Sequence, residues 1–273
     1  MKNERKANIF IEVFMWLCTS IVIVPILITI ITSFKSEREA SELSLVLPSR
    51  ILIGNYGTAI VVGKLLKCLG NSVFISIVSV VLIILLSSVL AFVTTRNRSK
   101  LNRFVGGLIT FGIIAPFAAM PTIKLLQILH IYGGYVSLIF VYTAVFLPFS
   151  TMLFSGFITT IPKELDEAGV VDGCKGVTLF YRIIFPLLQP VTITVAVLNL
   201  MWVWNDFQYS IYLINSSKMW TLPLSIYQFF GRFTQSWQLI TADMIMVTLP
   251  IVILYVLAQK YIIAGMTAGA VKG

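Results

Sequence analysis

Long apolar runs alternate with short polar segments along most of the chain. Apolar runs that approach or exceed the roughly 20 residues needed to cross a bilayer predict membrane-spanning helices. We expect such helices at residues 9–34, 70–95, 104–121, 135–157, 187–206 and 240–263. Strands of a membrane barrel would alternate apolar and polar residues instead. The pattern therefore predicts an all-α membrane protein with six transmembrane helices in a single domain over residues 1–273.

Composition and charge support this interpretation and orient the chain. Hydrophobic residues make up 58% of the sequence and charged residues 11%, whereas soluble domains carry about 25% charged residues. The net charge is +9. Most basic residues flank apolar runs, chiefly at the N-terminus and between Arg96 and Arg103. By the positive-inside rule, both places are cytoplasmic, and an even number of spans puts the C-terminus there too. We therefore expect membrane lipid, and no nucleic acid, around this chain.

The stretch over residues 161–190, which leads from the fourth run into the fifth, is too polar for hydrocarbon. Acidic residues crowd the turns after Pro162, where a helix N-terminus favours them. Gly173 is expected to end this helix, and a second short helix is expected over residues 176–185, ended by Pro186 and Pro190. The pattern predicts a helix–Gly–helix element on the cytoplasmic side. Taken on these residues alone, an ordinary amphipathic loop at the membrane interface stays open as the alternative.

The amino-acid sequence of this segment resembles a known motif. Residues 167–174 read E-A-G-x-x-D-G-C, followed by Phe180, Ile183, Pro186 and Pro190. This resembles the cytoplasmic EAA loop of binding-protein-dependent ABC importer permeases, in sugar permeases I-P-x-E-L-x-E-A-A-x-x-D-G-A. Gly169 and Cys174 stand where that pattern usually has Ala. Both replacements are small, so close packing with a partner is expected to survive.

Other stretches carry the same resemblance. Residues 265–273, G-M-T-A-G-A-V-K-G, are similar to the ending of maltose-type carbohydrate permeases. Residues 71–92 and 221–250 are similar to further parts of that family, so the likeness covers most of the chain after residue 70. A Gly-x-x-x-Gly helix-packing motif is the alternative explanation of the tail.

The resemblance implies a type I ABC importer permease in the bacterial inner membrane, with residues 158–186 as its cytoplasmic coupling loop. The implied partners are an ABC ATPase dimer, a second homologous permease, an extracytoplasmic solute-binding protein and a carbohydrate substrate. The ATPase would hold ATP and Mg²⁺; this chain has no G-x-x-x-x-G-K-[ST] and is expected to bind no cofactor or metal. The implied contacts to the ATPase in the loop are Glu164, Glu167, Ala168, Gly169, Asp172, Gly173, Phe180, Pro186 and Pro190. Those in the tail are Thr267, Gly269 and Lys272.

A candidate substrate path lies at the end of the fifth helix. Aromatic rings for sugar stacking are offered by Trp204 and by nearby Trp202. Polar groups for hydrogen bonds are offered by Asn205 and Asp206. An aromatic belt at the outer leaflet is the favoured explanation of the tryptophans from sequence alone.

Two other function classes are weighed against the importer. A secondary transporter or channel predicts ionisable residues in mid-helix, and the helix centres here are nearly free of charge. A membrane enzyme predicts motifs such as H-E-x-x-H or G-x-S-x-G, which the sequence lacks, and we expect no catalytic residues.

Overall fold

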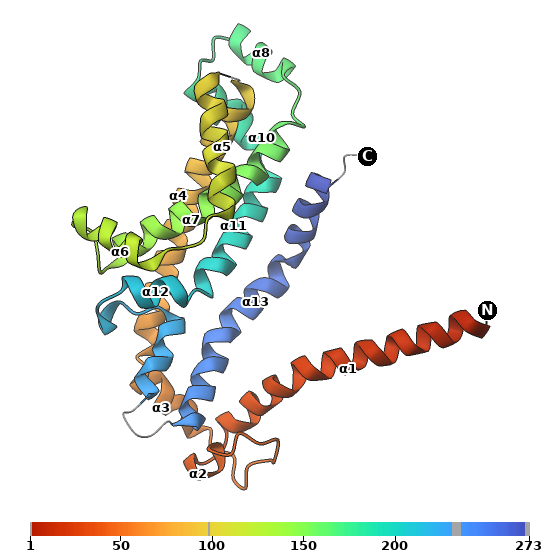
Figure 1. The fold of residues 1–273 in the computed structure, drawn as a ribbon, viewed down its shortest axis with the longest axis vertical. Coiled ribbons are helices and arrows are strands. Elements are labelled where there is room, and N and C mark those ends of the chain that lie inside the picture. The colour runs from red at the N-terminus through yellow and green to blue at the C-terminus, as the bar shows by residue number, and fades with distance from the viewer. Residues whose placement is uncertain (1, 98, 231–235, 271–273) are drawn as a thin grey trace. The chain divides into compact units, whose positions relative to one another are not determined.

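The computed structural model describes residues 2–97, 99–230 and 236–270 (Figure 1). Apart from one isolated bridge between Gly133 and Ile214, the regular structure of these residues is helical. They group into two units, each described by itself. The described parts of residues 1–67 and 225–250 form the first unit, and those of residues 68–224 and 251–273 form the second.

Six helices correspond to the six predicted runs. They are α1 (Lys2–Ser33), α4 (Leu65–Arg96), α5 (Lys100–Ile114), α7 (Tyr135–Ile158), α11 (Gln189–Trp204) and α13 (Trp237–Ala270). Shorter helices connect them: α2 (Glu37–Ala40), α3 (Gly54–Val62), α6 (Ala119–Ile128), α8 (Glu164–Val171), α9 (Val177–Leu179), α10 (Phe185–Leu187) and α12 (Gln208–Leu213). A π-helical stretch covers Phe180–Ile184, and 3-10 turns cover Ser217–Met219 and Leu222–Phe229.

Length and hydropathy support fewer spans than six in the described part of the chain. Four segments are long and apolar enough, Phe14–Ser33, Leu65–Arg96, Tyr135–Ile158 and Trp237–Gln259. A bent pair, Val177–Leu187 with Gln189–Trp204, raises the number to five. The all-helical membrane class is confirmed, and the count of six stays a prediction.

The third predicted helix, 104–121, is shorter than expected at its C-terminal end. α5 spans 15 residues, about 22 Å at 1.5 Å per residue, less than the roughly 30 Å of a hydrocarbon core. Ala115 is extended, with ψ of 122°, because the residue before a proline is pushed out of the helical region by Pro116. The early stop that Pro116 predicts is therefore present, and Pro121 falls inside α6 instead.

Other helices differ from the predicted bounds. α1, α4 and α13 all begin before their apolar runs, and α13 also extends beyond its run. At the start of α1 the additional residues are mostly polar, and polar residues with good helix propensity can continue a helix past the hydrocarbon. α11 is shorter than predicted because the chain bends by 79° at the break before it.

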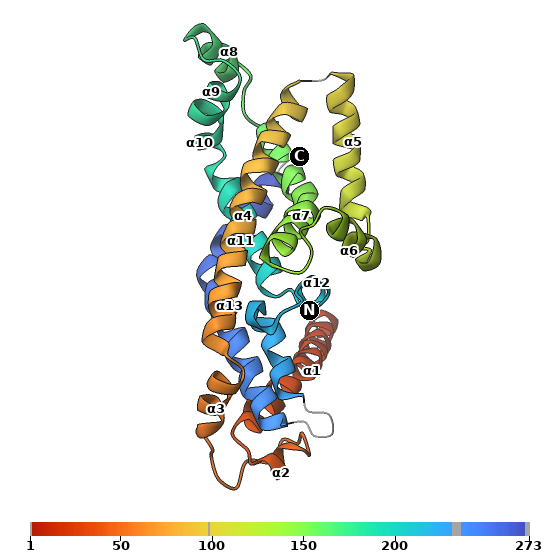
Figure 2. The same cartoon turned by 90° about the vertical axis from the view of Figure 1, so that its left-hand side faces the viewer.

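Two apolar clusters hold the second unit together, and α4 and α7 contribute to both. One contains Ile75 of α4 with Leu138 and Tyr142 of α7. The other contains Ala91 of α4 and Phe154 of α7. The second cluster also includes buried residues from the loop that follows α7, namely Ile161, Phe180, Ile184 and Leu188. The loop is thereby fastened to the helices, and Figures 1 and 2 show α8 at one end of this unit, beyond the end of α7.

In the first unit, a network of polar contacts orders the chain after α1. Lys35 is buried, and its Nζ donates to the Ser44 carbonyl oxygen at 2.8 Å and to the Ser44 hydroxyl at 3.2 Å. The Asn55 amide donates to the carbonyl oxygens of Ser33 and Lys35. The side chain of Glu39 accepts from the backbone N–H and the hydroxyl of both Ser36 and Ser49.

Glu39 gives this region a defined pH dependence. The hydroxyls of Ser49 and Ser36, followed by their backbone N–H groups, stabilise the carboxylate and lower the pKa of Glu39 from 4.5 to about 2. Because the pKa of Glu39 is lowered in the folded state, its carboxylate stabilises the folded region fully above pH 4.5. This stabilisation is lost as the pH falls from 4.5 to about 2. We expect amide protection of residues 36–50, corrected for intrinsic exchange rates, to fall over this interval. Glu39→Gln should already show the reduced protection at pH 7; equal protection in both proteins would contradict the assignment.

Candidate coupling site

α8 begins the polar loop and follows the predicted charge pattern. Glu164, Asp166 and Glu167 occupy its first turn, where the helix dipole favours negative charge. The helix begins after Lys163, later than Pro162 suggested. The Thr160 hydroxyl donates to the Phe157 carbonyl oxygen at 2.8 Å.

Gly173 ends α8, as predicted, through a specific turn. Its φ is +86°, in the left-handed region that favours glycine. The Gly173 N–H donates to the Val170 carbonyl oxygen at 3.0 Å, and the Cys174 N–H donates to the Gly169 carbonyl oxygen at 2.9 Å. This pair of bonds is a Schellman motif, which satisfies the last carbonyl groups of the helix.

The second half of the loop differs from the prediction in the role of its prolines. We expected Pro186 and Pro190 to end the second short helix. Instead they lie in the first turns of α10 and α11, where the missing N–H group of proline is not needed. The chain changes direction at Leu188, between those two helices.

The predicted contact residues of the loop divide into exposed and buried sets. Gly169 and Phe180 are buried. The others are exposed, namely Glu164, Glu167, Ala168, Asp172, Gly173, Pro186 and Pro190. Phe180 is 3% exposed and packs near the rings of Phe92 and Phe185. Its position is that of an anchor in the apolar cluster and not of a surface contact.

Gly169 packs against residues of its own loop. A Cβ atom at this position would lie 2.5 Å from Cδ1 of Ile183 and 2.6 Å from Cδ1 of Leu179. Glycine therefore allows α8 to approach the second half of its own loop. This packing accounts for Gly169 where the related pattern has alanine, because Leu179 and Ile183 fill the space of the methyl group.

The surface of α8 combines acidic and exposed apolar side chains. Leu165, Val170 and Val171 are exposed, Val171 by 86%. They lie among the acidic residues Glu164, Glu167 and Asp172, which are also exposed. We call these six residues, with Ala168, the α8 surface. Exposed apolar side chains next to charged ones on a short helix are compatible with a contact to another protein.

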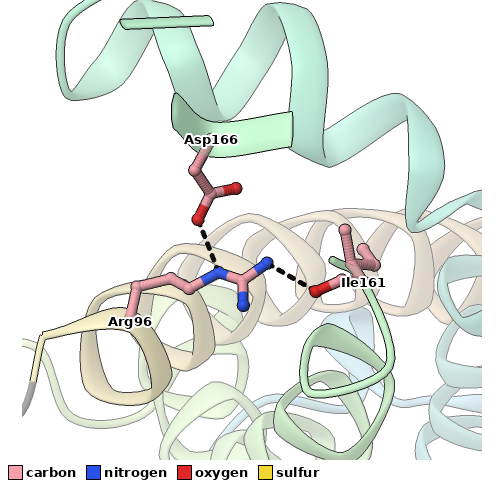
Figure 3. A network of polar contacts seen from close by, with 3 residues as sticks. All are labelled: Arg96, Ile161 and Asp166. Atoms are coloured by element: carbon pink, nitrogen blue, oxygen red, sulfur yellow. Dashed lines mark hydrogen bonds and ion pairs between the residues drawn. The ribbon is translucent and has the colours of Figure 1, made fainter. Parts of the chain in front are cut away.

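Arg96, at the end of α4, fixes α8 in place (Figure 3). Its Nε forms an ion pair of 2.7 Å with Oδ2 of Asp166. Its Nη2 donates to the Ile161 carbonyl oxygen at 2.9 Å. The two charged side chains are only 12% and 18% exposed, so solvent screens this pair less than an ordinary surface pair. One guanidinium group thus connects α4 to both the start of the loop and α8.

Sequence reasoning missed this role of Arg96. It was assigned only to the basic cluster that orients the chain, and Asp166 only to the helix dipole. The available signal was that both groups are predicted on the same side of the membrane, where an acidic loop needs a cationic partner.

The predicted tail contacts are described only in part. Thr267 and Gly269 lie in the last turns of α13, and their surroundings are not described. Lys272 lies outside the described residues. The tail contact therefore stays a prediction.

Asp206 of the predicted substrate path is held in a hydrogen-bond network. Its Oδ2 accepts from the Tyr142 hydroxyl at 2.7 Å and from the hydroxyl and N–H of Ser210, both at 3.0 Å. Its Oδ1 accepts from the Tyr209 N–H at 3.1 Å. Asp206 therefore joins α7 to the start of α12, a structural role.

An open pocket of about 530 Å³ lies beside this network. Its walls are Ile113, Val145, Phe146, Phe149, Met201, Trp202 and Asn205. Of the predicted path residues, only Asn205 reaches it; Trp204 is buried elsewhere. Trp202 packs against the rings of Phe146 and Phe149, with centroids 5.4 Å and 5.2 Å apart. In the described part of the chain, no group of His, Cys, Asp or Glu side chains is arranged to hold a metal ion.

Comparisons with known proteins extend over nearly the whole chain. Residues 3–268 match the family described as binding-protein-dependent transport system inner membrane component. The chain is 35% identical over 253 residues to the melibiose/raffinose/stachyose import permease protein MelC of Bacillus subtilis, covering 92% of this chain and 91% of that protein. It is 34% identical over 250 residues to AmyC of Thermoanaerobacterium thermosulfurigenes, a probable starch degradation products transport system permease protein, covering 91% of each.

A solved structure shares the fold. A chain of a bacterial ABC transporter involved in the import of the acidic polysaccharide alginate superposes with a TM-score of 0.83. The match covers 96% of this chain and 98% of that one at 18% identity. The resemblance seen in the loop and the tail is thus confirmed: the chain belongs to the family of binding-protein-dependent transport system inner membrane components and is a non-enzymatic transport subunit.

Proposed function

We propose that this chain is the permease subunit of an ATP-driven importer for a carbohydrate and forms half of its translocation pore. The observation that supports this best is the α8 surface, a set of exposed acidic and apolar side chains on a helix fixed to the end of α4 by Arg96. Exposure of Val170 and Val171 beside three carboxylates fits a contact with a partner protein.

The proposed mechanism derives from how the loop is held. A separate ATPase docks on the α8 surface, and Glu167 pairs with a basic residue of that subunit. Movement of the ATPase displaces α8. Because Arg96 ties α8 to α4, and Phe180 and Ile184 tie the loop to the apolar cluster, the displacement reaches the helices. The permease then alternates between inward-facing and outward-facing states.

The proposed assembly has four kinds of component. They are this chain, a second homologous permease, an ATPase dimer that binds ATP and Mg²⁺, and an extracytoplasmic solute-binding protein. In this arrangement both termini and the α8 loop are cytoplasmic, α5 completes six spans, and the membrane is the bacterial inner membrane. The tail residues Thr267, Gly269 and Lys272 reach the ATPase.

The substrate class rests on relatives and on one pocket. The names of the relatives refer to melibiose, raffinose, stachyose and starch degradation products. Trp202 and Asn205 border the same open pocket and offer an aromatic surface and an amide. Sugars bind in proteins through such a combination of apolar ring contacts and a few placed polar groups.

The experiment is uptake of a labelled oligosaccharide, the ligand of the cognate binding protein, into vesicles that contain the assembled transporter. Wild type should require ATP. Glu167→Lys should lower uptake at least about ten-fold and reduce ATPase co-purification, because like charges at an interface cost several kcal/mol. Glu37→Lys, at an exposed glutamate of α2, serves as the matched control and should behave as wild type. Proton- or sodium-driven uptake by this chain alone would favour a secondary transporter.

A further inference from the structure

The end of α4 opposite Arg96 is also tied to another segment. The Asn71 amide donates to the carbonyl oxygens of Lys218 and Trp220, at 3.2 Å and 2.9 Å. Its Oδ1 accepts from the Tyr135 hydroxyl of α7 at 2.8 Å. One residue further on, the Ser72 hydroxyl accepts from the Leu222 N–H at 2.8 Å. Residues 218–222, called here the distal segment, are thus fixed to α4 by both side chains.

Between these two attachments, α4 is one uninterrupted helix, as Figure 2 shows. It contains no proline, and Arg96 lies 25 positions after Asn71, about 37 Å along the axis at 1.5 Å per residue. Buried Ile75 near one end and buried Ala91 near the other belong to the two apolar clusters. An uninterrupted helix packed at both ends resists compression, so a displacement at one end is transmitted to the other.

We infer that α4 is a mechanical link between the α8 loop and the distal segment, with Arg96 and Asn71 as the positioning residues at its two ends. This inference rests on the proposed function, in which α8 meets the ATPase and the distal segment lies on the side of the solute-binding protein. Binding of the loaded binding protein changes the position of the distal segment, and α4 carries that change to α8. Because coupling between two sites is reciprocal, ATP binding at the ATPase acts back on the distal segment.

Two nearly isosteric substitutions separate this role from simple packing. Asn71→Asp keeps an oxygen that accepts from the Tyr135 hydroxyl. It loses the amide N–H groups that donate to the carbonyl oxygens of Lys218 and Trp220, and places a carboxylate next to those oxygens. Tyr135→Phe removes only the bond from α7 and leaves the distal segment attached. If Asn71→Asp does not assemble, Ser72→Ala removes the acceptor for the Leu222 N–H and is measured in its place.

The measurement is the ratio of ATPase rates of the reconstituted transporter with and without the loaded binding protein. Asn71→Asp should lower this ratio by about five-fold or more, the lower range of allosteric coupling, with an unchanged rate in the absence of the binding protein. Ser72→Ala should lower it by a smaller factor, and Tyr135→Phe should keep the wild-type ratio. A wild-type ratio in both Asn71→Asp and Ser72→Ala, or an equal loss in Tyr135→Phe, would overturn the inference.

A double variant tests whether the two ends act through one helix. If α4 is the link, Asn71→Asp combined with Asp166→Asn should lower the ratio no further than the more damaging single substitution. Effects that multiply would show independent roles and contradict the link. A wild-type transporter that the binding protein does not stimulate at all would count against the proposed function itself, and is thereby distinguished from failure of the link.

Discussion

Gly173→Pro should reduce ATP-driven uptake to the background level while the chain remains in the membrane. Gly173 has a φ of +86°, and the ring of proline fixes φ near −65°. The substitution also removes the N–H that donates to the Val170 carbonyl oxygen. A proline in a conformation it cannot adopt costs about 3 kcal/mol or more. The Schellman motif is lost, and α8 changes direction relative to α4.

The matched control for this position is Gly173→Asn. Asparagine enters the left-handed region more readily than other residues with a side chain, at a cost of about 1 kcal/mol, and keeps the N–H group. It should retain most of the uptake. The two variants are compared by uptake, by ATPase co-purification and by the amount of chain in the membrane. Equal activity of the proline and asparagine variants would contradict the role assigned to this turn.

Arg96→Ala should lower uptake by roughly thirty-fold, equivalent to about 2 kcal/mol. Exposed ion pairs contribute less than about 1 kcal/mol, and removal of one partner of a buried pair costs about 3–5 kcal/mol. The value of about 2 kcal/mol lies between these two cases. The pair with Asp166 is 12% and 18% exposed, nearer the buried case. Loss of the bond to the Ile161 carbonyl oxygen adds to the effect.

Exchange of the charges distinguishes the ion pair from a general need for a basic residue. Arg96→Asp combined with Asp166→Arg should recover part of the uptake lost in either single variant, because the attraction between α4 and α8 is restored. Recovery should be incomplete, since Asp at position 96 cannot donate to Ile161. If the double variant is no more active than Arg96→Asp alone, the pair does not link the two helices. Lys175→Ala, at an exposed cation of the same loop, is the control and should have little effect.

The parts of the fold that follow from local chemistry were predictable from sequence. The apolar runs predicted the long helices, Gly173 predicted the end of α8, and Pro116 predicted the end of α5. Each of these depends on residues that lie within a few positions of one another. Prolines in the loop were misplaced because proline is compatible with both a helix end and a first turn.

The parts that depend on tertiary contacts were not predictable. The pairing of Arg96 with Asp166 joins residues 70 positions apart, and the helix dipole alone already explained an acid at Asp166. The hydrogen bonds of Asp206 to Tyr142 and Ser210 likewise join distant parts of the chain or depend on the fold. Sequence named both Trp202 and Trp204 for stacking and could not tell that only Trp202 borders the pocket. The family pattern located the loop but did not indicate that Gly169 faces Leu179 and Ile183.

Docking of an ATPase on α8 can be detected by cross-linking from Val171. A photoreactive amino acid at this position, which is 86% exposed, should form an adduct with the ATPase in membranes that contain the assembled transporter. The same group at Val61 of α3, which is 76% exposed, should form none. An adduct from Val171, with a yield that changes on addition of ATP and Mg²⁺, is the predicted result. No ATPase adduct from Val171 in a transporter that is active in uptake would contradict the account.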